Sequence, residues 1–318
     1  MQIVFFILLI LIAIILIQHF LDKALIGQKK KYSIALYEGE DLFNLKPKIA
    51  PILTKFDVSD VKASFVADPF LIKYSDKYYL FMEVKSKRKR DIGEIGVAIG
   101  DSTENIKYQK IVLKEPFHLS YPNVLFENEK IYMIPESGEN RDLRLYEAVN
   151  FPFEWKLKKV ILKGKKFADA SFIFYNKLWW MFVSDIEDNS LHIYYSKSLL
   201  SEFTPHKQNP IYVNNKEKFR NGGNPVILDG KMYRFVQNCK NYYGEKLDVY
   251  EIKKLNQDEF EEKFIKTLFS PSKKGWNSDQ MHHISLLKEK DKIIAAVDGG
   301  SFEKENYYEI KKFLRKLF

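Results

Sequence analysis

The sequence predicts an all-β protein: a five-bladed β-propeller with an N-terminal transmembrane helix and a short C-terminal amphipathic helix. One phrase recurs five times, a short apolar strand, a polar turn and a second apolar or aromatic strand. The phrases begin at Asp68, Tyr121, Asp169, Gly223 and His282. They start 48 to 59 residues apart, a period typical of propellers, in which each repeat forms one four-stranded sheet.

A second pair of strands is expected after each of the first four phrases. These stretches are rich in β-branched and aromatic residues and tend to alternate in polarity. They are 93–113, 142–162, 190–206 and 246–269. Glycines such as Gly138 and Gly230 mark hairpin turns. Each unit is therefore expected to be a sheet of four antiparallel strands.

The fifth phrase lacks such a pair, because a charged segment follows it. A stretch that resembles the outer half of a blade begins instead at Tyr32. We expect residues 32–56 to complete the fifth blade, which closes the ring and removes an exposed sheet edge. The alternative is an unrelated N-terminal hairpin. The propeller would then occupy residues 32–302.

The N-terminal segment predicts a membrane anchor. Residues 3–17 are wholly apolar, and Phe20 and Leu21 extend the run. A spanning helix needs roughly 20 apolar residues, so the run is just long enough. A cleaved signal peptide is the alternative, but no basic residue precedes the run and no small-residue cleavage site follows it. We expect an anchor over residues 1–22 and a basic linker over 23–31.

The charges beside this anchor predict its orientation. Lys23 and Lys29 to Lys31 all follow the apolar run, so the positive-inside rule places the body of a single-pass protein in the cytoplasm. The single cysteine, Cys239, cannot form an internal disulfide, which is compatible with a reducing compartment.

The C-terminal segment, residues 303–318, predicts a basic amphipathic helix. Such a helix either lies in a lipid interface or docks on the propeller. The basic run Lys85–Arg90 is either a solvated turn or an element that faces anionic headgroups. The net charge of +9 does not indicate nucleic acid, because the charge is scattered or near the predicted membrane ends and no basic module with stacking aromatics is present.

A propeller gathers the first strand of every blade around one axis, so polar residues that open these strands should meet in an axial pocket. Three carboxylates are the candidate catalytic residues: Asp68, Asp169 and Glu136, the last at the end of a second strand. Glycosidic chemistry needs an acid and a second carboxyl as base or nucleophile, and a third charge can raise the pKa of the acid. The alternatives are that Asp68 binds turn amides and that Glu136 pairs with Arg144.

Other side chains are candidate substrate-binding residues. They are His118, Tyr121, Arg144, Arg220, Asn221, Arg234, Asp279 and His282, with Trp276 as a further aromatic. No metal or other cofactor is predicted, because the adjacent His282 and His283 should point to opposite faces of a strand. Cys239 lacks a paired base and is not expected to be a nucleophile.

The motifs in order resemble one known family. They are FVADPF with YYLFMEV, EPFHLSYPNV, IPES with RLYEA, FADASF with WWMFVSD, the Asn-Gly-Gly segment and the final HH with VDGG. Residues 32–301 resemble the N-terminal domain of plant glucosamine inositolphosphorylceramide transferases and their bacterial relatives. Those domains resemble the five-bladed propellers of arabinanases, levansucrases and family 43 glycoside hydrolases.

The resemblance implies roles for three strand-opening positions. In the hydrolases an Asp-Pro of the first blade carries the general base, and Asp68-Pro69 matches it. The second blade normally has another Asp-Pro, but this sequence has Tyr121-Pro122. The third blade normally supplies a Glu as acid, and Asp169 stands there. This departure puts hydrolysis of plant-wall pentosans in doubt, and Glu136 is the candidate to replace the missing charge.

These features favour a membrane-anchored carbohydrate-active protein of glycan or glycolipid assembly, with Asp68 as base, Asp169 as acid and Glu136 tuning the acid. A second hypothesis is a non-catalytic glycan-binding propeller that serves a partner glycosyltransferase. In the plant proteins a separate transferase domain follows this one. A third is a hydrolase outside the cell. The expected partners are a saccharide or glycolipid and a membrane, and whether the chain is an enzyme stays open.

Overall fold

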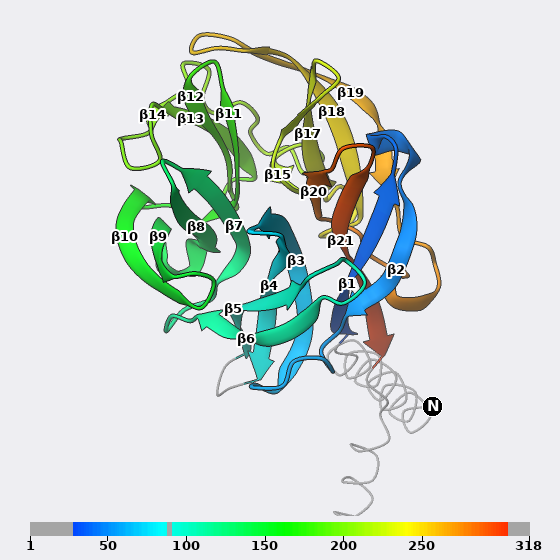
Figure 1. Ribbon diagram of the computed structural model, residues 1–318. Coiled ribbons are helices and arrows are strands. Elements are labelled where there is room, and N and C mark those ends of the chain that lie inside the picture. Colours follow the sequence, from blue (N-terminus) through cyan, green and yellow to red (C-terminus); the bar gives the residue numbers. More distant parts are fainter. Residues whose placement is uncertain (1–27, 88–90, 305–318) are drawn as a thin grey trace, which may run out of the picture. The chain divides into compact units, whose positions relative to one another are not determined.

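The computed structural model describes residues 28–87 and 91–304 and confirms the all-β five-bladed propeller. Five antiparallel sheets surround a common centre (Figure 1). Residues Tyr32–Ser301 form one compact unit. No helix among the described residues is long and apolar enough to span a bilayer. The predicted anchor, the C-terminal helix beyond Lys304 and residues 88–90 of the basic run lie outside the described residues.

The first three blades are continuous in sequence. Blade one contains β3 (Ala63–Tyr74), β4 (Lys77–Lys87), β5 (Asp91–Gly100) and β6 (Lys107–Leu113). Blade two contains β7 (Ser120–Glu127), β8 (Lys130–Ser137), β9 (Asp142–Asn150) and β10 (Glu154–Lys163). Blade three contains β11 (Phe167–Tyr175), β12 (Leu178–Asp185), β13 (Ser190–Ser196) and the short β14 (Thr204–Pro205).

The fourth blade divides its first strand, and the fifth combines both ends of the chain. Blade four contains β15 (Arg220–Asn221), β16 (Val226–Leu228), β17 (Lys231–Asn238), β18 (Lys246–Leu255) and β19 (Phe260–Phe269). Blade five contains β20 (Ile284–Lys288), β21 (Ile293–Lys304), β1 (Gln28–Gly39) and β2 (Lys46–Leu53). Its strand order is β2-β1-β21-β20, so the N-terminal strands close the ring. Three single-turn helices, η1 (Leu42–Asn44), η2 (Gly138–Asn140) and η3 (Gly275–Asn277), lie in connections.

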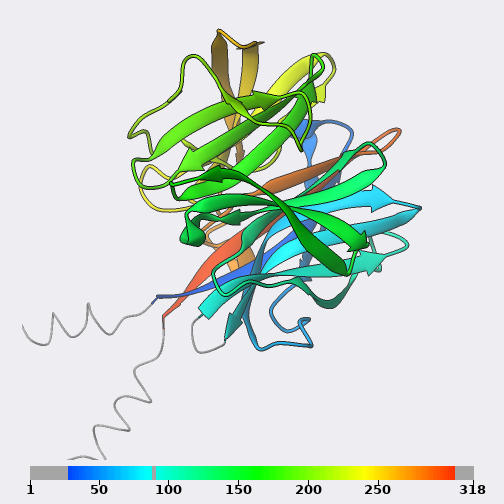
Figure 2. The same ribbon diagram turned by 90° about the vertical axis from the view of Figure 1, so that its left-hand side faces the viewer.

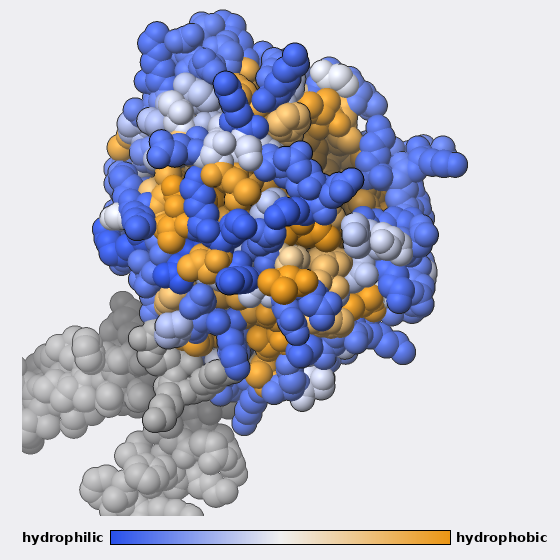
Figure 3. Space-filling model, turned by 60° about the vertical axis from the view of Figure 1, so that its left-hand side comes forward, coloured by the Kyte–Doolittle hydropathy of each residue, from blue (hydrophilic) through white to orange (hydrophobic). Residues whose placement is uncertain are grey.

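The core consists of five apolar clusters, one between each pair of neighbouring blades. Alternate residues of a strand point to opposite faces, so each sheet packs against both neighbours. On β1, for example, Leu36 packs between blades five and one, while Ala35 and Tyr37 pack between blades four and five. The sheets accordingly lie face to face in a side view (Figure 2). The outer surface in Figure 3 is mainly hydrophilic, with hydrophobic side chains in separate patches.

The strand directions define two ends of the propeller. We call the end at which β3, β7, β11 and β20 begin the mouth side, and the opposite end the far side. In an antiparallel blade the second and fourth strands return to the mouth side. Connections after second and fourth strands therefore lie on the mouth side, and those after first and third strands lie on the far side.

Candidate functional site

In three blades the same backbone irregularity places a side chain near the axis. Asp68, Tyr121 and Asp169 have φ angles of 50°, 49° and 52°. Each sits at a break in register between the first and second strands of its blade. A positive φ is uncommon for a residue other than glycine, and such outliers often mark functional sites. The strand-opening positions predicted from the repeat are therefore structurally equivalent.

Asp68 belongs to a buried cluster with blade five. Its backbone N–H donates to Asp298 Oδ2 at 3.0 Å, and its own Oδ2 accepts the Tyr121 N–H at 3.3 Å. His282 joins the two carboxyls: Nδ1 lies 2.6 Å from Asp298 Oδ1, and Nε2 lies 3.9 Å from Asp68 Oδ1. Tyr32 stacks on the imidazole ring with centroids 5.0 Å apart. This cluster is closed to solvent.

Electrostatics divide this cluster into one charged pair and one neutral acid. Burial raises the pKa of Asp68 well above its usual value, and nearby Asp298 adds to the effect against the opposing influence of His282. Burial also opposes charge on His282, but Asp298 outweighs it and the imidazole pKa is raised. Burial would raise the pKa of Asp298, but His282 lowers it overall. The ion pair is therefore His282–Asp298, and Asp68 holds a proton beside it.

Asp169 instead pairs with a cation from blade four. Arg220 Nε donates to Asp169 Oδ2 at 2.6 Å, and its NH2 group lies 3.9 Å from Glu136 Oε2. The guanidinium lies over the Tyr243 ring, 4.8 Å from its centroid. The Arg220 and Glu136 side chains are 13% and 14% exposed, against 3% for Asp169. The accessible groups here are thus Arg220 and Glu136, with Asp169 behind them.

Glu136 has the acidity expected of a general acid. Burial raises its pKa to about 7, and nearby Asp169 contributes in the same direction while Arg220 opposes it. Glu136 does not pair with Arg144. That arginine donates to Asp142 Oδ2 at 2.8 Å and lies over the Phe117 ring. The alternative that Glu136 pairs with Arg144 within its own blade is therefore wrong.

Glu83 is an axial carboxyl that the sequence analysis did not select. It lies on β4 opposite Ala67, next to Asp68, and burial raises its pKa to about 8. Its Oε1 lies 3.6 Å from Nε2 of His118. The other nitrogen, Nδ1, accepts the Gly93 N–H at 2.7 Å, and burial with Lys85 lowers the His118 pKa to about 4. Despite the short separation, this contact therefore joins two neutral groups at neutral pH.

Glu83 and Asp298, which were not among the predicted site residues, lie at matching positions of the repeat. Each phrase ends its second strand with a polar residue at a matching place: Glu83 in LFMEV, Glu136 in MIPES and Asp298 in AAVDGG. These residues pair with, or hydrogen-bond to, the openings of first strands. Aligning the ends of the phrases as well as their beginnings would have identified Glu83 and Asp298.

Hydrogen bonds between blades support the floor of the site. Tyr121 Oη lies 2.6 Å from Ser171 Oγ. Asn123 and Asn224 exchange amide hydrogen bonds of 2.5 and 2.9 Å across the axis. His283 Nε2 donates to the Pro69 carbonyl at 3.0 Å, so it points away from the His282 cluster, as alternation along the strand predicts.

Several predicted substrate-binding residues have structural roles instead. Arg234 is fully buried in a two-bond ion pair with Glu262 and donates to Asn221 Oδ1 at 3.0 Å. Asn221 in turn donates to the Asp169 carbonyl at 3.0 Å. Both side chains are buried and hydrogen-bonded within the protein, Arg234 inside blade four and Asn221 also to carbonyls of blade three. Asp279 is half-buried in a mouth-side connection, where its carboxylate accepts the Ser278 hydroxyl at 2.6 Å.

The buried cluster also has the composition of a metal site. Asp68, His282 and Asp298 each offer one ligand atom, and these atoms lie within 4.8 Å of one another. The opposite orientations of His282 and His283 are compatible with this set, because only His282 belongs to it. The short His282–Asp298 hydrogen bond already satisfies the most buried of the three groups.

Comparisons with known proteins agree with this architecture. The family described as glucosamine inositolphosphorylceramide transferase 1, N-terminal, matches residues 27–300. The glucosamine inositolphosphorylceramide transferase 1 of Oryza sativa subsp. japonica is 41% identical over 267 residues, 80% of this chain and 36% of that protein. The Arabidopsis thaliana protein of the same name is 37% identical over 298 residues, 84% of this chain and 39% of that protein. The chain thus spans little more than a third of these relatives.

Solved structures show the same fold at low identity. An exo-β-1,3-galactanase from Clostridium thermocellum has a TM-score of 0.57 at 14% identity and covers 71% of this chain and 54% of its own. The family 62 α-L-arabinofuranosidase of Coprinopsis cinerea has a TM-score of 0.55 at 10% identity and covers 75% and 92%. These likenesses show the five-bladed fold alone. The sequence matches, by contrast, show that the chain belongs to the glucosamine inositolphosphorylceramide transferase 1 N-terminal family.

Proposed function

We propose that the axial site binds a saccharide and acts on a glycosidic bond during glycan or glycolipid assembly. The observation that carries this is Glu136, an accessible carboxyl with a pKa of about 7 beside the Arg220–Asp169 ion pair. A general acid works best with a pKa near the working pH, and a second, charged carboxylate is what glycosidic chemistry requires.

The electrostatic environments of the three carboxyls favour catalytic roles that differ from those expected from the sequence. Glu136 donates its proton to the leaving oxygen as the bond from that oxygen to the sugar breaks. Asp169, held by Arg220, stabilises the positive charge that develops on the sugar. The incoming hydroxyl forms the new bond and returns its proton to Glu136. Asp68 is a positioning residue, since it retains a proton and supports the Tyr121 backbone.

Family membership supports a lipid-linked saccharide as the substrate. The relatives are named as transferases that act with glucosamine and inositolphosphorylceramide. We propose that this chain handles the same general class, a sugar carried on or destined for a lipid. We further propose that residues 1–22 anchor it in a membrane, with the propeller in the cytoplasm.

A second candidate is glycan binding without turnover, on behalf of a partner glycosyltransferase. It is favoured by the burial of Asp68, Asp169 and Asp298, whose carboxylates all have partners within the protein. The accessible Arg220, Tyr243 and Glu136 would then supply hydrogen bonds and a stacking surface.

The test is a screen of the purified full chain against nucleotide sugars and glycolipids, with binding and turnover measured separately. Glu136→Gln should lower turnover by about 10²–10⁴-fold and retain binding. Glu147→Gln, an outer-strand change in the same blade, is the matched control. Unchanged turnover in Glu136→Gln would refute the catalytic role. Saccharide binding without product in the unmodified protein would establish the second candidate.

A further inference from the structure

The two ends of the propeller carry different charge. The described far-side connections contain twelve acidic and four basic residues. These connections are 40–45, 75–76, 101–106, 128–129, 151–153, 176–177, 197–203, 229–230, 256–259 and 289–292. The described mouth-side connections contain eleven basic and nine acidic residues. They are 54–62, 114–119, 138–141, 164–166, 186–189, 213–219, 239–245 and 270–283.

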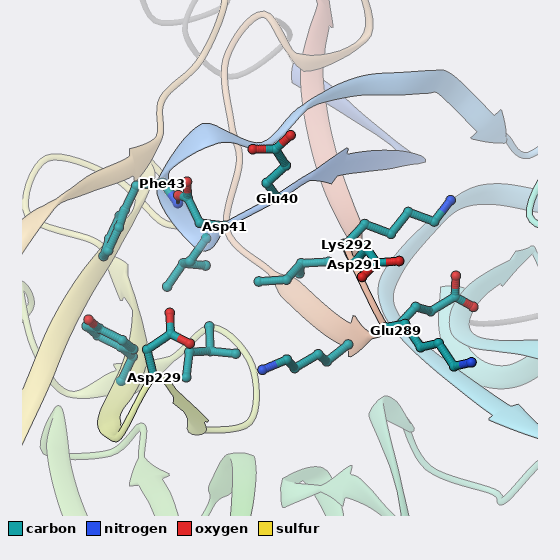
Figure 4. Close-up of a pocket in the computed structure, with 13 residues that line it drawn as sticks. Glu40, Asp41, Phe43, Asp229, Glu289, Asp291 and Lys292 are labelled. Carbon is teal, nitrogen blue, oxygen red and sulfur yellow. Dashed lines mark hydrogen bonds between the residues drawn. The ribbon is translucent and has the colours of Figure 1, made fainter.

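A cavity on the far side has more acidic than basic residues in its lining. It has a volume of about 290 Å³ and lies between connections of blades four and five. Acidic side chains line it together with lysines of the β20–β21 hairpin (Figure 4). The acidic residues are Glu40, Asp41, Asp229, Glu289 and Asp291. An anionic surface would be repelled from this end of the propeller.

The mouth side lacks this acidic excess and has slightly more basic than acidic residues. Lys85 and Lys87, near the end of β4, add two basic residues to this end. Large apolar side chains also project from mouth-side connections. They are Phe56, 85% exposed, Val213, Tyr242 and Ile186. Phe56 has the ammonium group of Lys55 5.0 Å from its ring centroid. Basic residues interspersed with exposed apolar ones suit the headgroup region of a bilayer.

Both ends of the compact unit also lie on the mouth side. The Tyr32 hydroxyl donates to Gln280, and Gly300 exchanges backbone hydrogen bonds with the same residue. Gln280 belongs to the mouth-side connection 270–283. The compact unit therefore begins and ends on the mouth side, where Gln280 also donates to the carbonyl of Tyr243, the residue under the Arg220 guanidinium.

We propose that the propeller binds an anionic lipid surface through its mouth side, so that the axial site opens toward the headgroups. Electrostatic attraction acts within a Debye length, about 8 Å at physiological ionic strength, so the connections at the contacting end determine the orientation. This inference deepens the proposed function. It rests on that function in one respect, namely that the substrate is carried on a lipid. Exposed apolar residues also lie near the far side, such as Phe126 and Phe174, so the difference in charge, and not in apolar exposure, distinguishes the two ends.

The test measures orientation in the full chain. A Cys239→Ser parent receives one cysteine at a time, at Phe56 or Lys274 on the mouth side or at Asp101 or Asp291 on the far side. Each variant is labelled with a fluorophore and reconstituted in phosphatidylcholine–phosphatidylglycerol vesicles that contain a headgroup nitroxide quencher. We expect several-fold stronger quenching at both mouth-side positions. Equal quenching at all four positions, or stronger quenching on the far side, would overturn the proposal.

A charge-reversal pair tests the cause. Lys273→Glu with Lys274→Glu should reduce the difference in quenching between the two sides, and so should vesicles of phosphatidylcholine alone. The far-side pair Lys290→Glu with Lys292→Glu is the matched control and should not reduce the difference. A mouth-side reversal without effect would contradict the electrostatic contact. Because the readout is orientation, it is independent of whether Glu136→Gln abolishes turnover.

Discussion

Asp68 and Asp169 occupy the same position of the repeat but have opposite electrostatic environments. Both have a positive φ, both follow a break in register and both are buried. Asp68 shares the imidazole of His282 with a second carboxyl, Asp298. Asp169 has the guanidinium of Arg220 at 2.6 Å. The comparison teaches that a repeat determines where a side chain is placed, whereas the other blades determine which charged groups surround it.

The largest expected effect is the loss of the cation beside Asp169. Arg220→Met leaves Asp169 and Glu136 without their partner in a buried site, so the free energy of unfolding should fall by about 3–5 kcal/mol. Urea denaturation at neutral pH measures the change. The double variant Arg220→Met with Asp169→Asn should recover part of the loss. A loss below about 1 kcal/mol, as for a surface pair, would show that the ion pair is not structurally important.

The next effect is the pH dependence of stability. Burial raises the pKa of Glu83 from 4.5 to about 8 and of Glu136 from 4.5 to about 7. For a carboxyl whose folded pKa is raised, the associated stability is present below the unfolded pKa and is lost as pH rises through the folded pKa. The free energy of unfolding should therefore fall as the pH rises from 4.5 to about 8, by at most about 1.4 kcal/mol for each unit by which a carboxyl pKa is raised.

The variant Glu83→Gln measures the contribution of Glu83 to this pH dependence of the free energy of unfolding. Its glutamine cannot ionise, so the variant should gain stability relative to the unmodified protein above pH 8 and not below pH 4.5, the limits given by the folded and usual pKa values. Denaturation on either side of the window checks this. Parallel pH curves for the two proteins would mean that Glu83 ionises as easily when folded as when unfolded.

The smallest effect compares the two aspartates directly. Asp169→Asn removes a hydrogen bond between charged groups, worth about 1.5–3 kcal/mol. Asp68→Asn replaces a carboxyl that already holds a proton and can still accept the Tyr121 N–H, so it should cost less at neutral pH. Thermal or urea denaturation of both variants ranks them. A greater loss for Asp68→Asn would reverse the assignment of charge between the two halves of the site.

The repeat allowed the axial positions to be predicted but not their partners. The spacing of the phrases was enough to place Asp68, Tyr121 and Asp169 at first-strand openings, because periodic strands must lie at equal distances from the axis. Nothing in the local sequence distinguishes Arg220, which reaches Asp169, from Arg234, which is used up by Glu262 inside blade four. The two arginines differ in which face of a blade they occupy and in what faces them.

The sequence by itself determined the number of blades, their order and the positions that open each first strand, because alternation of apolar residues and turn chemistry are local properties. Only the tertiary structure decided that Asp298 pairs with His282, that burial outweighs the charge of Lys85 and raises the pKa of Glu83, and that Glu136 has the acidity of a general acid. Those properties depend on burial and on charges from other blades, which meet only when the ring is closed.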